Sequence, residues 1–251
     1  MRFLQDDHGP NRYAVPALHQ SDRGVTDRAL QVEYLGRRAY GEVLELQRAV
    51  AADRIAGSRP DTLLLVEHEP VVTLGRSTKR EHLLLSEQAL AARGVELFDI
   101  ERGGDVTFHG PGQLVGYPIF DLQQHKPDLH WYLRQVEQAL IDTLATYDIT
   151  GQRVEKYTGV WVDDRKIASI GVHARSWVTW HGFALNVSTD LSYFDMMVPC
   201  GIPQVTMTSI SRELGRAVSL EEVVDRVTTT FTSVFDLTCV VPSLSSPSSP
   251  V

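Results

Sequence analysis

Cys200 and Lys166 have the residue types and the surroundings that nucleophilic chemistry requires. Cys200 lies in the loop VPCGIP at 198–203, and not on an apolar periodic face. The glycine after it leaves the sulfur approachable and predicts a backbone N–H that is free to face an oxyanion. Free cysteines are more often small buried hydrophobic residues, so position alone leaves both interpretations open. Cys239 follows the last expected helix beside two valines and fits the buried interpretation.

Lys166 comes at the start of the apolar run IASIGV at 167–172. A lysine at such a place is usually a solvated strand end, because its stem can cover apolar surface while its charge stays in water. The alternative is a lysine held over a cleft, beside a thiol or a carbonyl. There its ammonium would lower the pKa of a neighbouring thiol from about 8.5 toward neutrality.

A third candidate is the stretch RGGDVTFHGPGQLVGYP at 102–118, which holds five glycines and two prolines. Such backbone freedom between two apolar runs indicates a main chain that approaches a ligand closely. Arg102, His109 and Gln113 add a cation, an imidazole and an amide. The stretch is therefore predicted to be a binding surface, and taken alone it makes His109 its best catalytic candidate.

Composition and motifs disfavour several other functions. A net charge of −8 argues against a general nucleic-acid binder. No apolar run approaches the roughly 20 residues that span a bilayer, and an acidic N-terminus predicts no signal peptide. Two cysteines without a CxxC pair indicate a reduced, cytoplasmic protein. HExxH, GxxxxGK[ST] and GxGxxG motifs do not occur, so we expect no metal and no cofactor.

The elements that must position these candidates alternate between helical and extended patterns. Helices are predicted at 35–55, 86–92, 128–147 and 219–235. Strands are predicted at 62–66, 71–74, 95–100, 114–122, 159–162, 166–172 and 177–187, with a hairpin turn at 163–165 and a long loop at 188–206. This order predicts an α+β fold, with mixed β-sheets packed on helices.

The domain organisation is expected to be simple. Residues 1–33 are polar and without periodicity, and are predicted to form a loosely ordered N-terminal extension. Residues 239–251 are a Ser/Pro-rich tail that cannot form a core. One catalytic domain at 34–238 is the simplest interpretation of what lies between.

Five separated blocks of the sequence agree with one known signature. They are RGG at 102–104 with TFHGPGQL at 107–114 and Tyr117, EH at 67–68 with LGR at 74–76, KIASIG at 166–171, HGFALN at 181–186, and PCG at 199–201. Together they resemble the lipoyl(octanoyl) transferases, the octanoyl-carrier-protein:protein octanoyltransferases of lipoate biosynthesis. The resemblance covers residues 35–236.

The resemblance implies a single domain of the biotin/lipoyl protein ligase type with a Cys/Lys dyad. Cys200 would take the acyl group from octanoyl-acyl carrier protein as a thioester, and Lys166 would lower the Cys200 pKa and move protons. Lipoyl domains of 2-oxoacid dehydrogenase complexes, or the glycine cleavage H protein, would then accept the chain on a lysine. The enzyme would be a cytoplasmic monomer that needs no cofactor, no metal and no nucleic-acid or membrane partner.

The resemblance also implies an acyl pocket, which makes the glycine-rich stretch a wall of the site. Its residues would be Arg102, Gly103, Gly104, Asp105, Val106, Thr107, Phe108, His109, Ser169, Ile170, Gly171, Gly182, Phe183 and Ala184.

Two other functions were weighed against transfer through a thioester. An ATP-dependent lipoate or biotin ligase on the same scaffold is disfavoured because an adenylating enzyme needs no nucleophile at Cys200. A non-catalytic binder of acyl carrier protein is disfavoured because both Cys200 and Lys166 are in place. Since the net charge of −8 is unfavourable for two acidic partners, a basic rim is predicted around the site. Its residues would be Arg76, Lys79, Arg80 and Arg175.

Overall fold

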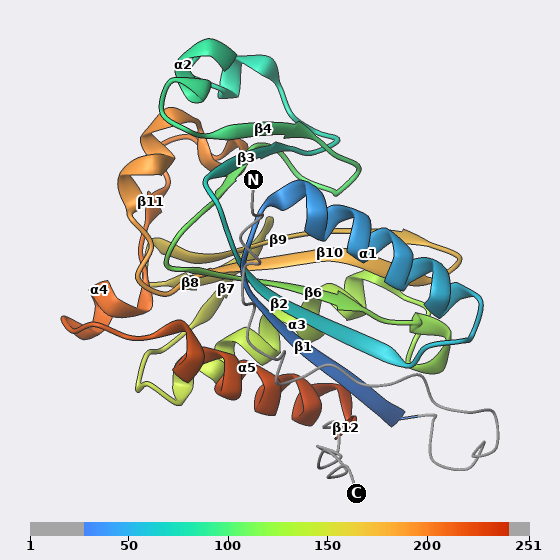
Figure 1. The fold of residues 1–251 in the computed structure, drawn as a ribbon. Coiled ribbons are helices and arrows are strands. Elements are labelled where there is room, and N and C mark those ends of the chain that lie inside the picture. Colours follow the sequence, from blue (N-terminus) through green and yellow to red (C-terminus); the bar gives the residue numbers. More distant parts are fainter. Residues whose placement is uncertain (1–27, 241–251) are drawn as a thin grey trace, which may run out of the picture.

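The computed structural model describes residues 28–240, and its core is a nine-stranded mixed sheet with a smaller three-stranded sheet beside it (Figure 1). The large sheet has the order β12-β1-β2-β6-β10-β9-β8-β7, with β11 beside β9, and the small one has the order β4-β3-β5. The strands of the large sheet are β1 (Ala29–Arg38), β2 (Asp61–His68), β6 (Gln113–Ile119), β7 (Gln152–Val154), β8 (Tyr157–Val162), β9 (Arg165–Arg175), β10 (Val178–Asn186), β11 (Thr206–Met207) and β12 (Thr238–Val240). The small sheet holds β3 (Val71–Leu74), β4 (Glu96–Asp99) and β5 (Thr107–His109).

Helices cover both faces of the large sheet. One face is covered by α1 (Tyr40–Ile55), and the other by α3 (Leu129–Ala145) and α5 (Leu220–Phe235). The short α2 (Glu87–Ala91) packs on the small sheet, and α4 (Ile210–Leu214) follows β11. In β2, Leu63 and Leu65 pack in the cluster that contains α3 and α5, whereas Leu64 and Val66 pack with Val43 of α1. This is the alternation of a strand buried on both faces. The predicted α+β fold of mixed sheets packed on helices is confirmed.

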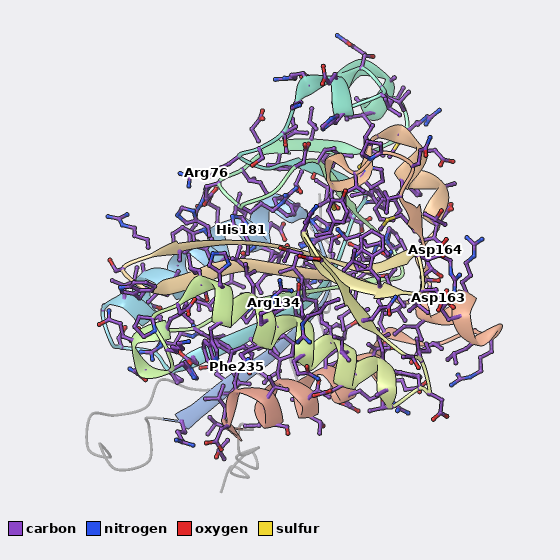
Figure 2. The ribbon with its side chains drawn as sticks, turned by 180° about the vertical axis from the view of Figure 1, so that it is seen from behind. Arg76, Arg134, Asp163, Asp164, His181 and Phe235 are labelled. Atoms are coloured by element: carbon purple, nitrogen blue, oxygen red, sulfur yellow. The ribbon has the colours of Figure 1, made fainter. Side chains whose placement is uncertain are left out.

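The two faces can be followed from behind in Figure 2. Arg134 of α3 and Phe235 of α5 lie on one side of β9 and β10, and His181 lies on the other. The α3 and α5 layer buries the larger core, and the candidate site described below takes residues from both sides, His181 on one and Leu133 of α3 on the other.

Side-chain caps explain where the predicted helices begin. The Asp128 carboxylate accepts a hydrogen bond from the Trp131 N–H at 3.0 Å, and the Ser219 hydroxyl accepts one from the Glu222 N–H at 3.2 Å. The helices predicted at 128–147 and 219–235 are therefore confirmed to within two residues. Leu129, the first residue of α3, is 38% exposed.

The predicted first helix is wrong at its start. Residues up to Arg38 belong to strand β1, and helix α1 begins only at Tyr40. Leu30 and Val32 alternate with polar residues and are buried in the main core, which is the two-residue period of a strand.

The large sheet extends past both expected domain boundaries. β1 begins at Ala29, before the expected start at 34, and β12 runs to Val240, past the expected end at 238. The two strands pair in parallel, so both ends of the described chain are held in one sheet. The other residues of the expected extension and tail, 1–27 and 241–251, lie outside the described residues.

The glycine-rich stretch and the predicted loop at 188–206 both contain regular structure. The glycine-rich stretch holds β5, which pairs antiparallel with β3. The loop predicted at 188–206 contains two short 3₁₀ helices, η4 (Leu191–Met196) and η5 (Pro199–Gly201), and the first residue of β11. The strand predicted at 114–122 ends at Ile119. β5 was missed because three residues between glycines are too few to show a period.

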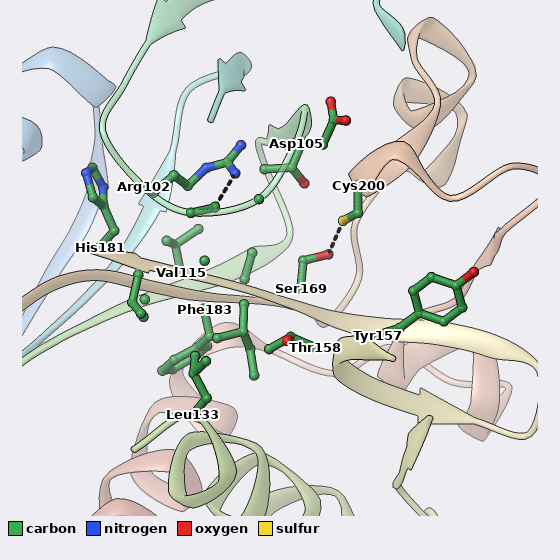
Figure 3. A pocket seen from close by; sticks show the side chains of 18 of the residues that line it. Arg102, Asp105, Val115, Leu133, Tyr157, Thr158, Ser169, His181, Phe183 and Cys200 are labelled. Carbon is green, nitrogen blue, oxygen red and sulfur yellow. Dashed lines mark hydrogen bonds between the residues drawn. The ribbon is translucent and has the colours of Figure 1, made fainter. Parts of the chain in front are cut away.

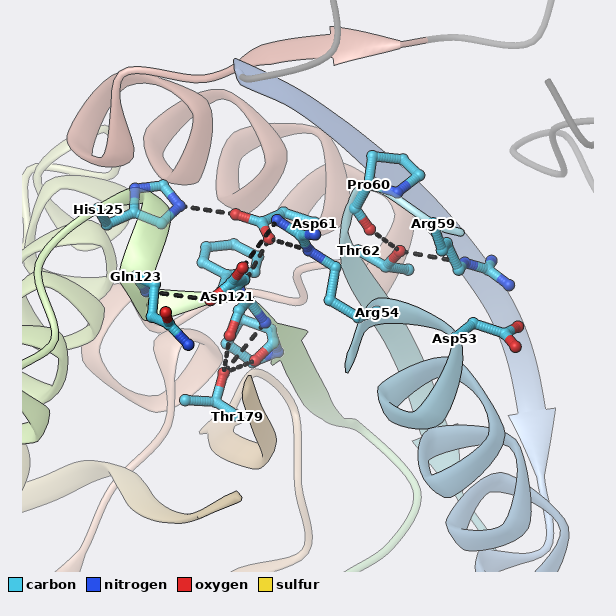
Figure 4. Close-up of polar contacts among 12 residues, drawn as sticks. Asp53, Arg54, Arg59, Pro60, Asp61, Thr62, Asp121, Gln123, His125 and Thr179 are labelled. Carbon is cyan, nitrogen blue, oxygen red and sulfur yellow. Dashed lines mark hydrogen bonds and ion pairs between the residues drawn. The ribbon is translucent and has the colours of Figure 1, made fainter. Parts of the chain in front are cut away.

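A buried polar network joins the end of α1 to the sheet (Figure 4). Arg54 Nε donates to Asp61 Oδ1 at 2.8 Å, and the same oxygen accepts the Asp121 N–H at 2.9 Å. His125 Nε2 lies 2.6 Å from the other Asp61 oxygen. One carboxylate thus ties together α1, the start of β2 and the segment after β6. These partners offset the cost of burying its charge.

The close contact between Gly182 of β10 and its paired strand β6 gives a testable packing prediction. A Cβ at Gly182 would lie 2.1 Å from the backbone oxygen of Gly116. We expect Gly182→Ala to destabilise the protein by about 1–3 kcal/mol in urea unfolding, because a backbone atom has to move. Gly41→Ala in α1 is the control, since its Cβ would meet Phe98 at an ordinary 3.5 Å. A Gly182→Ala protein as stable as the control would contradict this account.

Candidate active site

A cavity of about 490 Å³ lies where β9, β10 and the glycine-rich stretch meet the loop of Cys200 (Figure 3). Its volume is within the range of small-molecule sites. The predicted site residues that line it are Arg102, Gly103, Gly104, Asp105, Thr107, His109, Lys166, Ser169, Ile170, Gly171, Gly182, Phe183, Ala184 and Cys200. Residues almost a hundred positions apart are thus brought to one cavity.

Val106 and Phe108 do not line this cavity, which corrects their predicted place in the pocket wall. Both are fully buried in the core beneath the small sheet, where the Phe108 ring stacks on Tyr193 at 4.4 Å between centroids. Successive side chains of a strand point to opposite faces, so Thr107 and His109 face the cavity while Val106 and Phe108 face the core.

Cys200 is held in a strained turn. Its φ of 55° and the φ of 66° at Gly201 are both left-handed. Such a conformation is costly outside glycine and is found mainly at functional sites. A side chain at position 201 would also lie 2.6 Å from Asp105 Oδ2, so only glycine fits there. Asp105 is itself fixed by His82 Nδ1 at 2.7 Å.

The Cys200 amide is not free, contrary to the prediction from sequence. The Cys200 N–H donates to the Val106 oxygen at 2.9 Å, and the Gly201 N–H donates to the Val198 oxygen at 3.0 Å. The first bond ties the cysteine loop to the residue before β5, and the second closes the turn of the loop itself. An oxyanion at this thiol would have to find other donors.

Lys166 is a buried lysine and not a solvated strand end, since it is only 2% exposed. The pairing of β8 with β9 shifts by one residue between Val160 opposite Ala168 and Trp161 opposite Lys166. The extra residue is Ile167, which makes a β-bulge. Lys166 and Ser169 would face opposite sides of a regular strand, and the bulge turns both toward the cavity.

Lys166 and Ser169 act together on the Cys200 thiol. The Ser169 hydroxyl lies 3.5 Å from the sulfur. Burial raises the pKa of the thiol, but the Lys166 ammonium, the Ser169 hydrogen bond and the more distant Arg102 charge outweigh it and hold this pKa below its usual value. Burial alone acts on Cys239 and raises its pKa. Cys200 is therefore the thiol that favours the thiolate, which is the nucleophilic form.

A glycine on β8 makes room for Lys166. Gly159 has a φ of 137°, and a Cβ there would lie 2.9 Å from Lys166 Cε. The Gly159 N–H donates to Glu137 Oε1 of α3 at 3.1 Å. Glu137 is fully buried, and its other oxygen accepts bonds from Arg134 at 2.6 Å and Arg153 at 2.9 Å. We infer that this carboxylate fixes the backbone against which the lysine packs.

Changing Glu137 is expected to disturb Lys166 from a distance. Glu137→Leu leaves the buried Gly159 N–H without an acceptor, which should cost about 1–3 kcal/mol and raise the Cys200 thiol pKa. Glu137→Gln keeps an amide oxygen for that N–H and should keep the thiol pKa of the wild type. The pH dependence of Cys200 alkylation tests both. Equal profiles for the leucine and glutamine variants would show that this anchor does not position Lys166.

Two polar residues of the glycine-rich stretch are fixed by the protein itself. Arg102 donates to the Thr73 oxygen at 2.7 Å and to the Thr73 hydroxyl at 2.9 Å. His109 Nδ1 lies 2.8 Å from Gln113 Oε1, and burial lowers the pKa of His109 to about 3. A neutral, pinned imidazole is suited to a wall, so His109 is not the general base that the isolated stretch indicated.

Several cavity residues were not predicted. They are Tyr40, Val115, Tyr117, Leu129, His130, Leu133, Lys156, Tyr157, Thr158, Val172, His181 and Ile202. Val115 and Tyr117 lie inside the glycine-rich stretch, and His181 directly precedes Gly182, so these had a signal in the motifs. Tyr40 begins α1 and had none, because only the fold brings that helix to the cavity.

The surroundings of the cavity limit other chemistry and the predicted rim. In the described part of the chain, no cluster of histidine, cysteine and carboxylate side chains could hold a metal ion. Across 28–240, no helix is long and apolar enough to span a membrane.

Of the predicted basic rim, Arg80 is paired with Glu87 at 2.9 Å. Arg76 lies near His173 on β9, where burial and this guanidinium lower the pKa of His173.

Comparisons with known proteins agree on one family. The family model of the lipoyl protein ligase A/B catalytic domain matches residues 39–232. An octanoyltransferase of Solibacter usitatus is 54% identical over 202 residues, which cover 80% of this chain and 91% of that protein. An octanoyltransferase of Chloroflexus aurantiacus is 49% identical over 213 residues, which cover 84% and 96%.

Solved structures show the same fold at low identity. A putative lipoate protein ligase from T. acidophilum with bound lipoic acid has a TM-score of 0.65 at 15% identity, over 85% of this chain and 87% of that one. A lipoate-protein ligase A bound with ATP has a TM-score of 0.61 at 16% identity, over 85% and 88%. At such identities the likeness supports the arrangement of sheets and helices only.

Proposed function

The chain belongs to the lipoyl protein ligase A/B catalytic-domain family, among its octanoyltransferases, and on that basis we propose that it transfers an octanoyl group from octanoyl-acyl carrier protein to the target lysine of lipoyl domains. It is accordingly an acyltransferase. The observation that carries the proposal is the meeting of a low-pKa thiol at Cys200 with Lys166 and Ser169 in one cavity.

The first step would move the acyl group onto the enzyme. The Cys200 thiolate attacks the thioester carbonyl, a new C–S bond forms, and the bond to the carrier's sulfur breaks. The departing thiolate takes a proton and leaves as a thiol. Because one thioester is exchanged for another, this step is close to neutral in free energy. The Lys166 ammonium is the donor suited to the oxyanion, since the Cys200 amide is occupied by Val106.

The second step would move the acyl group to the acceptor. The neutral amine of the target lysine attacks the thioester of Cys200, a C–N bond forms, and the C–S bond breaks. The amine loses one proton, and Cys200 returns to its thiolate. Aminolysis of a thioester runs downhill, so no ATP is required. Protons would pass between Cys200 and Lys166 in both steps.

The glycine-rich wall supports the placing of an acyl chain. The Gly103 N–H donates to the Val172 oxygen of β9 at 2.9 Å, which closes the wall against the sheet. A Cβ at Gly171 would meet the Gly103 oxygen at 2.6 Å, so glycine is needed for this contact. At about 0.8 kcal/mol per buried methylene, such a chamber can bind a medium-length chain firmly.

Intact-mass spectrometry tests the proposal. After mixing with octanoyl-acyl carrier protein without ATP, the protein should gain one octanoyl group that hydroxylamine removes. Addition of a lipoyl domain, or of glycine cleavage H protein, should move that mass to the acceptor as a hydroxylamine-resistant amide. An acylation that requires ATP would instead favour a lipoate ligase on this fold. A mixture that yields no acyl-enzyme and no acylated acceptor would disprove the proposed transfer.

A further inference from the structure

One wall of the cavity carries a buried histidine, although a hydrocarbon chain is expected to lie there. His181 lines the cavity and is 1% exposed. Neither of its ring nitrogens has a hydrogen-bond partner within the described residues. The closest carboxylate oxygen, Glu101 Oε1, lies 3.8 Å from Nε2, too far for a hydrogen bond. Two buried polar atoms of one side chain therefore lack a partner from the protein.

His181 is fixed in this place by its backbone. Its φ of 55° interrupts the extended course of β10, and its N–H donates to Gln47 Oε1 of α1 at 3.0 Å. Burial lowers the pKa of the ring to about 3, so the imidazole is neutral and offers one donor and one acceptor. A strained backbone that aims an unpartnered ring into a cavity is a feature of functional sites.

His181 lies at the opposite end of the cavity from the thiol. In Figure 3, Arg102 separates His181 from Cys200 and Ser169. The Arg102 charge influences both the thiol and the His181 ring, as expected for a residue between them. Tyr40 and Tyr117 line the same cavity and lie close to this guanidinium. A chain that runs from Cys200 toward His181 would therefore pass Arg102 before its far end meets the ring.

The balance of burial and hydration sets where such a chain stops. Buried polar atoms that lack a protein partner are usually hydrated, and a cavity of about 490 Å³ has room for water. Each added methylene strengthens binding about fourfold. Displacing the water from an unpaired polar group weakens binding by about five- to a hundredfold. The loss at His181 therefore exceeds the gain from the methylene that reaches it.

We propose that His181 is the polar stop of the acyl chamber and sets the longest saturated chain that Cys200 accepts. This inference rests on the proposed function and adds to it the residue that selects chain length. Selection of this kind differs from a steric wall, because the stop rejects a methyl terminus and accepts a polar one. A chain that ends in a hydroxyl can replace the water at His181 and keep its hydrogen bonds.

Acylation rates across a chain-length series test the stop. Acyl-carrier thioesters of six to twelve carbons are offered to the wild type, to His181→Leu and to His181→Asn, and the adduct on Cys200 is timed. His181→Leu should raise the rate for ten- and twelve-carbon chains relative to eight by about tenfold or more. His181→Asn, polar and tolerant of a left-handed backbone, should keep the wild-type preference. An unchanged ratio in His181→Leu overturns the proposal.

His173→Leu is the matched control, because this histidine of β9 packs on Trp180 and is not among the cavity residues. Its chain-length ratio should equal that of the wild type. A shift as large as that of His181→Leu would assign the effect to general loosening and overturn the stop.

A second measurement needs no variant, which matters because leucine at a left-handed φ could unfold the protein. For the shortest plain chain that the wild type rejects, a terminal hydroxyl should restore acylation. Failure of the hydroxyl to help would mean a steric wall and would overturn the proposal. If the wild type forms no adduct with any chain, the proposed function fails; if adducts form but neither effect appears, only the stop fails.

Discussion

Cys200→Ala should lose the octanoyl adduct and at least about a thousandfold of the transfer rate to lipoyl domains. The alanine removes the sulfur that forms the thioester and leaves Lys166, Ser169 and the cavity wall in place. Direct attack of the acceptor amine on the carrier thioester would lack the covalent intermediate. Intact-mass spectrometry of the enzyme, together with the initial rate of acceptor acylation, measures both losses.

Cys239→Ser is the matched control for this experiment. Cys239 is the only other cysteine of the chain, lies in the edge strand β12, and has a thiol pKa that burial raises. It should keep the adduct and the full rate. An adduct that persists in Cys200→Ala, or disappears in Cys239→Ser, would place the acyl group on another residue and refute the proposed mechanism.

Lys166→Met should separate activity from stability. Methionine fills much of the space of the lysine stem and removes a buried charge, so the protein should be as stable as the wild type or more so. The transfer rate should nevertheless fall by about 10²- to 10⁴-fold, which is the usual range for a lost acid–base group. Urea unfolding and the rate of acceptor acylation, measured on the same preparation, test the two halves.

The direction of the pH effect in Lys166→Met follows from the charge that is lost. In the wild type the Lys166 ammonium helps to hold the Cys200 pKa below its usual value. Without the ammonium, burial dominates and the pKa rises. The curve of iodoacetamide alkylation against pH, recorded in a Cys239→Ser background, should therefore move to higher pH. Superimposable curves would show that Lys166 does not activate the thiol.

The sequence predicted best what depends on neighbouring residues. Helices with a capping side chain, such as Asp128 and Ser219, were located within two residues, and the hairpin around 163–165 was found. Most cavity residues were identified through their motifs. Strand β1 was missed because its first residues, which include Leu30 and Val32, were assigned to the loosely ordered extension and residues 35–38 to the first helix.

Features that depend on contacts distant in sequence could not be predicted. The Cys200 amide was expected to be free, and only the fold brings the Val106 oxygen within 2.9 Å of it. Val106 and Phe108 belong to the motif, but the small sheet turns them into its own core. The unpartnered ring of His181 could not be predicted either. The Gln47 side chain of α1 accepts the His181 backbone N–H, but no group of the described residues pairs with the ring nitrogens.

The β-bulge at Ile167 decides on which face of β9 Lys166 lies relative to Ser169. Lys166 and Ser169 face one cavity because one unpaired residue lies between two paired runs of β9. Because the bulge absorbs one residue, the three-residue spacing of Lys166 and Ser169 keeps both on one face, whereas a regular strand of the same sequence would turn Lys166 toward the opposite face of the sheet. The same motif can therefore form the site or fail to form it, depending on whether the pairing with β8 leaves Ile167 unpaired.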